Sequence, residues 1–347
     1  MAYTTINKST DHFNTKLYTG NGSTQSITGV GFQPDWLWIK NRSGTNDHIL
    51  QDVVRGATKS LESNGTSAET TSSTRVTSFD SDGFSVGSAG TNNTNSSNYV
   101  SWNWKAANSQ GSSNTDGSIN TTYTSANTTA GFSISQYVGT GSNATIGHGL
   151  GAVPKWIIVK NLSASGNSWC VYHSGIGNTA AAFLEGTVVP HAHVDYWNNT
   201  SPTSSVFYIG AGTGTNGNGN NLIAYCFAEK TGYSKFGSYT ANGNADGNFI
   251  YTGFAPKFII LKRTDTSGYN WIMMDDKSNT YNPWTNLLLP NLNNAEITSG
   301  GATDFLSNGF KLRSASGANP TTNQGTIIYM AFGQSLVGSN NVPCTAR

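Results

Sequence analysis

The sequence predicts an all-β protein built from three tandem β-sandwich, jelly-roll-like domains joined by polar linkers. The first observation is a ten-residue segment that occurs three times, as GFQPDWLWIK at residues 31–40, GAVPKWIIVK at 151–160 and GFAPKFIILK at 253–262. The second is the composition: 40 Gly, 9 Pro and only 11% charged residues leave Ser, Thr, Asn and Gly to form many turns. Short apolar runs between polar turns, repeated at about the length of a small domain, are typical of tandem β-sandwiches.

Each repeated segment is predicted to be a strand that is buried on both faces. Gly and Pro mark its beginning, because Pro cannot donate a hydrogen bond to a neighbouring strand. A short apolar run and a Lys follow, and this run is too short for a buried helix. Trp36, Trp156 and Phe258 hold the same position in the three copies. We therefore expect these three side chains to lie on equivalent strands and Trp156 to anchor the core of its repeat.

The remaining strands are predicted from β-branched and aromatic residues between polar turns. In the first repeat they are 13–18, 48–54, 75–79, 84–86 and 99–105, and Asp80-Ser-Asp-Gly83 is the signal for a hairpin between two of them. In the second repeat they are 132–138, 169–173, 206–209 and 222–229, and in the third 236–239, 257–261, 271–275, 310–313 and 326–332.

These elements divide the chain into six parts. We place an N-terminal arm at 1–12, the first β-sandwich at 13–107, a Ser/Thr/Asn/Gly linker at 108–131, the second β-sandwich at 132–234, the third at 235–335 and a C-terminal tail at 336–347. The linker is predicted because its composition cannot bury enough apolar surface to fold alone.

Composition argues against several functional classes. The formal net charge is +1 and Lys and Arg do not cluster, so we expect no nucleic-acid binding. No apolar run approaches the ~20 residues that cross a bilayer, so we expect no membrane insertion. Gly212-Thr-Gly214-Thr-Asn-Gly217 matches the dinucleotide fingerprint, but a helix should follow such a motif and another strand is predicted instead. We therefore expect a hairpin loop there and no cofactor.

His191, His193 and Asp195 form the one candidate metal site in the sequence. On a strand, these alternate residues would all point to one face, at a spacing that suits a transition metal. In a trimer, such a row could surround one ion on the axis. The alternative is an exposed polar strand or loop.

Aromatic residues among polar neighbours are the candidate ligand-binding residues. Tyr196, Trp197, Tyr281 and Trp284 are predicted to lie in loops, where their rings could cover the apolar face of a sugar while nearby amides bind its hydroxyls. The alternative is that these rings belong to a core. For Trp102 and Trp104 a core or a subunit interface is the favoured interpretation.

The order of several segments resembles a family of phage virion proteins. These segments are GFQPDWLWIKN, SNTDGSI, GFSI…YVGTGSNATIGHGLG, KWIIVKN, IAYCFAEKTGYSKFGSYT and YTGF-P-KFIILKRTD, from about residue 13 to 334. The family consists of tail-fibre or virion-surface proteins with tandem β-rich repeats, frequent among marine bacteriophages. The resemblance implies a structural or attachment role at the virion surface, with other virion proteins as partners and assembly in the host cytoplasm. It supplies no catalytic residues.

The function predicted from the sequence is therefore that of a tail fibre or surface fibre that attaches to host glycans and is not an enzyme. One alternative is a purely structural capsid or tail decoration protein without a receptor. A second is a glycan depolymerase, which would need paired acids in a groove. We also expect a homo-oligomer, namely a trimer, with Tyr99, Trp102 and Trp104 as interface anchors. A monomer whose three repeats supply the multivalency is the alternative.

Overall fold

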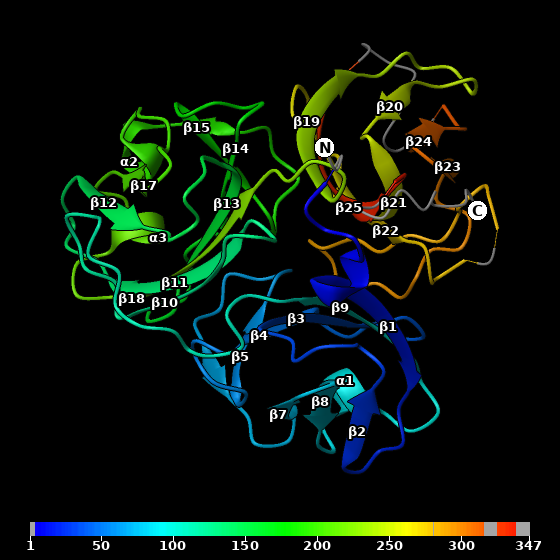
Figure 1. Ribbon diagram of the computed structural model, residues 1–347, viewed down its shortest axis with the longest axis horizontal. Helices are drawn as coiled ribbons and strands as arrows, with labels where there is room; N and C mark the ends of the chain where they lie inside the picture. Colours follow the sequence, from blue (N-terminus) through cyan, green and yellow to red (C-terminus); the bar gives the residue numbers. More distant parts are fainter. Residues whose placement is uncertain (1–3, 280, 316–324, 338–347) are drawn as a thin grey trace.

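The computed structural model describes residues 4–279, 281–315 and 325–337, and almost all of its regular structure is β (Figure 1). Each repeat forms one large antiparallel sheet and one small sheet that packs beside it. This confirms the predicted all-β sandwich class. Residues 1–3 of the predicted arm and 338–347 of the predicted tail lie outside the described residues.

The first repeat contains β1 to β9. The large sheet has the order β1-β9-β3-β4-β5-β6, with β1 Phe13–Thr19, β9 Asn98–Trp104, β3 Trp36–Asn41, β4 Ile49–Asp52, β5 Lys59–Glu62 and β6 Thr70–Thr71. The small sheet has the order β2-β8-β7, with β2 Gln25–Thr28, β8 Gly83–Val86 and β7 Val76–Asp80. The predicted hairpin is present, because β7 and β8 pair as Asp80↔Gly83. Two short helices, η1 Ser9–Asp11 and α1 Gly90–Asn93, complete this repeat.

The second repeat contains β10 to β18. Its large sheet has the order β10-β11-β18-β13-β14-β15-β16, with β10 Tyr123–Asn127, β11 Phe132–Val138, β18 Asn221–Ala228, β13 Pro154–Asn161, β14 Cys170–His173, β15 Ala180–Phe183 and β16 His191–Ala192. The small sheet pairs β12 Ala144–Gly147 with β17 Val206–Ile209. The helices are α2 Val194–Trp197 and α3 Thr213–Asn216. The segment predicted as a linker contributes β10, and Ile119 forms a bridge with Ile146, so this segment packs on the second repeat.

The third repeat contains β19 to β25. Its large sheet has the order β19-β25-β21-β22, with β19 Ser234–Thr240, β25 Thr326–Ser335, β21 Phe254–Arg263 and β22 Ile272–Asp275. The small sheet has the order β20-β24-β23, with β20 Phe249–Tyr251, β24 Gly309–Leu312 and β23 Thr303–Leu306. In the described parts of the chain, no helix has the length and apolar character needed to span a bilayer.

The three repeated segments occupy equivalent strands, as predicted. In each repeat the aromatic residue two positions after the Pro of the core strand pairs on one side with a residue of the closing strand and on the other side with a polar residue of the next strand. These triplets are Trp104–Trp36–Asp52, Phe227–Trp156–His173 and Phe332–Phe258–Asp275. The shared register means that the three repeats have one strand topology around their core strands.

One hydrophobic core is shared by all three repeats, in addition to a smaller core inside each. The ring of Trp36 lies 4.5 Å from that of Trp104 and 4.6 Å from that of Tyr225 in the second repeat. Phe13 lies 5.3 Å from Phe258 in the third repeat. Each large sheet thus has one face on its own core and one face on the common core. This explains why the repeated segments are apolar on both faces.

The common core corrects the predicted role of three aromatic residues. Tyr99, Trp102 and Trp104 are at most 1% exposed. Trp102 and Trp104 belong to the common core and Tyr99 belongs to the core of the first repeat. They therefore cannot anchor an interface between subunits, because their surfaces are already covered by their own chain. The division into three separate domains stays a prediction.

Equivalent polar residues join the repeats in a closed ring. The hydroxyl of Tyr225 in the second repeat donates to Asp52 Oδ2 in the first, at 2.7 Å. Trp102 Nε1 in the first repeat donates to Asp275 Oδ2 in the third, at 3.1 Å. His173 Nε2 in the second repeat lies 3.2 Å from the carbonyl oxygen of Tyr329 in the third. Figure 1 shows the resulting arrangement, with the three groups of strands around a common centre.

The N-terminal arm packs against the last strand of the chain. Ile6 is buried in the common core. The backbone N–H of Ser9 donates to Gln334 Oε1 at 2.9 Å, and Gln334 Nε2 donates to the carbonyl of Asn7 at 3.1 Å. The arm therefore helps to close the ring between the first and third repeats.

The Lys that ends each repeated segment is buried and bonds to carbonyl groups. Lys40 Nζ donates to Asn41 O at 2.7 Å. Lys160 Nζ donates to Asn167 O, and Lys262 Nζ to Tyr269 O, each in the loop that follows the strand. Burial lowers the pKa of each of these three lysines to about 8, because desolvation disfavours the ammonium form.

The buried lysines predict that stability rises between pH 8 and pH 9.5. An unfolded Lys has a pKa of ~10.4, so in this range the unfolded chain binds more protons than the folded chain, and the free energy of unfolding increases with pH. We expect a gain on the order of 1 kcal/mol per lysine in urea denaturation. Lys262→Met should reduce this slope, and Lys8→Met, at an exposed position, should not. A stability that stays level or falls over this range would contradict the prediction. Above pH 10 the buried tyrosines oppose the effect, since burial raises the pKa of Tyr329 to about 12.

Candidate functional site: an aromatic and polar cleft in the second repeat

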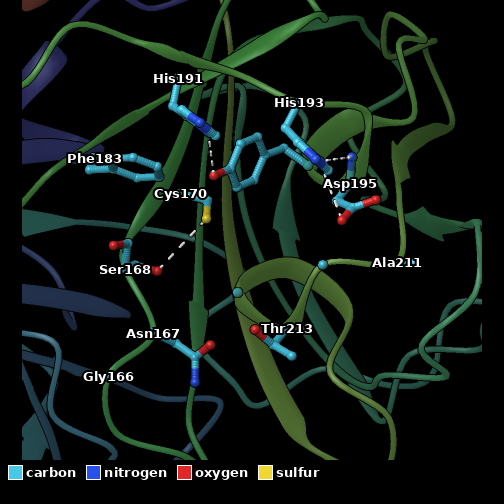
Figure 2. Close-up of a pocket in the computed structure, with 13 residues that line it drawn as sticks. Gly166, Asn167, Ser168, Cys170, Phe183, His191, His193, Asp195, Ala211 and Thr213 are labelled. Atoms are coloured by element: carbon cyan, nitrogen blue, oxygen red, sulfur yellow. Dashed lines mark hydrogen bonds and ion pairs between the residues drawn. The ribbon is translucent and has the colours of Figure 1, made fainter.

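A cleft of about 490 Å³ opens at the edge of the large sheet in the second repeat (Figure 2). It lies between the loop that precedes β14, the end of β15, the β16–α2 segment and α3. Figure 2 shows His191 and His193 on one side of the cleft, with Asn167 and Thr213 on the opposite side. All three predicted metal ligands therefore line the same cleft as Tyr196, one of the predicted ligand-binding residues.

The chain turns between the two histidines. His191 belongs to β16, which pairs with β15 as Ala181↔His191 and ends at Ala192. His193 is already the N-cap of α2, and its Nδ1 accepts the backbone N–H of Asp195 at 3.3 Å. A side chain that accepts an N–H in the first turn is the usual way to begin a helix. A strand that would point all three side chains to one face is therefore not present, although all three side chains reach the cleft. The segment matches the alternative of an exposed polar strand and loop for His191 to His193, followed by the short helix α2.

The predicted metal site is not formed. Among the described residues there is no group of three or more His, Cys, Asp or Glu side chains that could hold a metal ion. Instead, His191 Nδ1 lies 3.0 Å from the hydroxyl of Tyr196, and His193 Nδ1 lies 3.3 Å from Asp195 Oδ2. The two histidines are thus engaged by different partners inside the cleft.

Four rings gather along one part of the cleft. The ring of Phe183 lies 5.8 Å from that of Tyr196, and the ring of His191 lies 5.9 Å from it. The rings of His191 and His193 are almost parallel, at 6.1 Å and 7°. Burial is the main cause that raises the pKa of Tyr196, followed by Cys170 and Asp195, so its hydroxyl stays protonated at neutral pH. The cleft therefore offers aromatic faces together with neutral and anionic hydrogen-bonding groups.

The other predicted ligand-binding residues do not share this site. Trp197 is 1% exposed, and its Nε1 donates to the carbonyl of Ala180 at 3.1 Å. Trp284 is 2% exposed and packs on Phe305 with ring centroids 5.5 Å apart. The prediction that these two tryptophans bind ligand is wrong, because their rings are covered by the chain's own core. Tyr281 is 80% exposed but belongs to the third repeat, away from the residues that line the cleft.

Sequence reasoning missed the glycines that shape one wall. The predicted hairpin loop at 212–217 instead contains the one-turn helix α3, followed by β18. A Cβ on Gly212 would lie 2.9 Å from the carbonyl oxygen of Asp195, and a Cβ on Gly214 would lie 3.0 Å from Cys170 Sγ. A side chain at position 212 would therefore require the backbone of α2 to shift, and one at position 214 would press on the Cys170 side chain of β14. The closely spaced glycines in the sequence were a signal of close packing. They could not show which residues they pack against, because those residues are far away in the sequence.

Cys170 is not a nucleophile in this cleft. Burial is the main cause that raises the pKa of its thiol far above the usual range, with Glu185 as a second cause and Lys160 acting in the opposite direction. Only a thiolate attacks effectively, so a buried thiol held neutral is inert. Cys170 therefore contributes packing and polarizable surface to the floor of the cleft.

The corresponding positions in the other repeats have different chemistry. Phe183 pairs with Cys170, and the equivalent pair in the first repeat is Glu62 with Ile49. There, Arg75 NH2 binds Glu62 Oε1 at 2.9 Å. In the third repeat the equivalent region is a smaller pocket of about 220 Å³, lined mainly by apolar residues such as Leu287, Leu289 and Ile297, together with Tyr269 and Asn270. The cleft of the second repeat differs from this pocket in its two histidines and one aspartate.

One family model matches this chain. It is described as a domain of unknown function, DUF7483, and it matches residues 8–335. The match begins in the N-terminal arm, spans all three repeats and ends with β25. The comparison with curated proteins gives no match.

Proposed function

The chain belongs to the DUF7483 domain family, and we propose that it is a phage virion protein of a tail or surface fibre that binds a host-surface glycan. Two observations support this proposal. The first is the resemblance of the segment order to phage tail-fibre and virion-surface proteins. The second is the cleft in the second repeat, which carries the attachment role in this proposal. Other virion proteins would be its partners, and the virion surface its location.

The cleft has the chemistry that sugar binding uses. Aromatic rings cover the apolar C–H surface of a sugar, while nearby polar groups bind its hydroxyls. Phe183 and Tyr196 supply such rings, and Asp195, Asn167 and Thr213 supply polar groups. This combination of half-buried rings and polar side chains in one cleft is the observation that carries the proposed attachment role.

The residues that line the cleft suit the binding of a sugar better than the hydrolysis of a glycosidic bond. Glycoside hydrolases of the common types use two carboxyl groups across the scissile bond. Among the described residues that line the cleft, Asp195 supplies the carboxylate, and the Cys170 thiol is held neutral. The depolymerase alternative would therefore need a second acid from outside this lining.

Replacing Tyr196 by alanine should weaken glycan binding by about tenfold or more, since interface tyrosines often contribute more than 1.4 kcal/mol. The measurement is the affinity of the full chain for a panel of bacterial surface polysaccharides. Tyr281→Ala removes a more exposed tyrosine outside the cleft and should leave the affinity unchanged within about twofold. An equal loss of affinity in both variants, or no loss of affinity in Tyr196→Ala, would show that the glycan binds outside the cleft.

Two further measurements separate the proposal from its alternatives. Antibody against the chain should label intact phage particles and block adsorption to the host. Labelling without loss of adsorption would favour a purely structural decoration protein. Release of sugar fragments from a polysaccharide by the pure protein would favour the depolymerase instead.

The trimer remains a prediction, but Tyr99, Trp102 and Trp104 cannot be its interface residues, because they are buried within the chain. Three repeats already surround one core within a single chain. Light scattering on the isolated chain decides between a trimer and a monomer, for which the mass would be near 36.8 kDa.

A further inference from the structure

We propose that the cleft of the second repeat binds its ligand through a positively charged ammonium group, as carried by an amino sugar or a quaternary ammonium headgroup. This inference rests on the proposed binding role of the cleft and names the chemical class of the ligand. It is carried by the arrangement of four rings and one carboxylate in the same cavity.

The rings form a group that suits a cation. Ring faces carry negative electrostatic potential and attract a cation placed within ~6 Å, and grouped rings are a recognised way of binding quaternary ammonium groups. Tyr196 is the centre of the group here, with Phe183, His191 and His193 all within 6.3 Å of it, measured between ring centroids. Phe183 and His191 are themselves 6.4 Å apart.

The carboxylate of Asp195 lies next to these rings and is exposed to the cleft. Its side chain is 43% exposed, and its Oδ2 lies 3.3 Å from His193 Nδ1. The same nitrogen accepts the backbone N–H of Asp195 at the start of α2. The described residues that line the cleft supply no Lys or Arg to pair with this carboxylate, so a ligand ammonium group would supply the opposite charge.

The other charged groups around the cleft do not cancel the negative charge of Asp195. The described residues that line it include no Lys or Arg. Behind the lining, Glu185 accepts the backbone N–H of Trp169 at 3.0 Å, and Lys160 donates to the carbonyl of Asn167. With Asp195, these side chains place two carboxylates and one lysine near the cavity.

The test compares choline with 3,3-dimethylbutan-1-ol, its uncharged isostere, by titration calorimetry on the full chain at pH 8. Choline should bind at least about fivefold more tightly, as one cation–π contact provides. Asp195→Asn and Tyr196→Ala should each remove this preference. Asp11→Asn, which changes an exposed carboxylate in the N-terminal arm, should keep it.

A second series identifies the source of the ammonium group. Glucosamine, N-acetylglucosamine and glucose are compared at pH 7, and circular dichroism verifies the folding of each variant. Tighter binding of glucosamine than of choline assigns an amino sugar, and the reverse assigns a quaternary headgroup. Equal binding of choline and its isostere would overturn the inference, while Tyr196-dependent binding of uncharged glycans would leave the proposed function standing. Choline binding by a chain that binds no glycan would support the inference and refute the proposed glycan receptor.

Discussion

Replacing Trp156 by alanine should lower the free energy of unfolding by about 3–5 kcal/mol, the usual cost of removing a large aromatic side chain from a core. Trp156 is fully buried on β13. Its ring lies 5.9 Å from that of Trp271 and 6.4 Å from that of Phe236, both in the third repeat. The substitution therefore opens a cavity at the junction of two repeats, and urea denaturation at pH 7 measures the loss.

A phenylalanine at position 156 is the matched control. Among the described residues, Trp156 Nε1 has no hydrogen-bond partner, so Trp156→Phe removes a buried unsatisfied N–H while keeping most of the packing. Its cost should be clearly smaller than that of Trp156→Ala. An alanine variant as stable as the parent chain would show that β13 is not a strand buried on both faces.

Replacing Arg55 by methionine should destabilise the chain by about 3–5 kcal/mol, because it leaves a buried carboxylate without its partner. Arg55 Nε lies 2.5 Å from Asp52 Oδ2, and the two side chains are 1% and 0% exposed. Tyr225 of the second repeat donates to the same oxygen. The pair therefore lies at the junction of the first and second repeats, where water cannot replace the guanidinium. The free energy of unfolding in urea is the measurement.

Two comparisons make this prediction specific to a buried charge. Arg55→Met combined with Asp52→Asn removes both charges and should recover part of the lost stability. Lys8→Ala breaks the ion pair with Asp11, whose side chains are 66% and 52% exposed, and should change stability by less than ~0.5 kcal/mol. If the double variant were no more stable than Arg55→Met, the uncompensated charge would not be the cause of the loss.

Local sequence patterns predicted the core and closing strands of each repeat but missed shorter strands such as β5, β12 and β23. Gly and Pro followed by a short apolar run marked β3, β13 and β21, and the Asp80–Gly83 turn marked the β7–β8 hairpin. These features depend on neighbouring residues, since backbone preferences and side-chain alternation act within a few positions. The same reasoning did not predict that the strand at His191 ends at Ala192, where the His193 side chain accepts the backbone N–H of Asp195 and caps α2.

The candidate site was predicted only in part. His191, His193, Asp195 and Tyr196 were chosen from their chemistry, but as two separate sites with different ligands. Only the fold brings them together with Phe183, Cys170 and the glycines of α3. Such contacts join segments that are tens of residues apart, and no local pattern encodes which segments meet.

By itself, the sequence determined that this chain repeats one strand pattern three times and that its core strands are apolar on both faces. Only the tertiary structure decided which residues pack against the second face of each core strand. Trp102 could have faced a partner subunit, but it lies in the common core and donates to Asp275 in another repeat. The physical reason is that burial is favoured for any aromatic surface wherever a complementary surface is available. Which surface is available follows from how the three repeats close on one another.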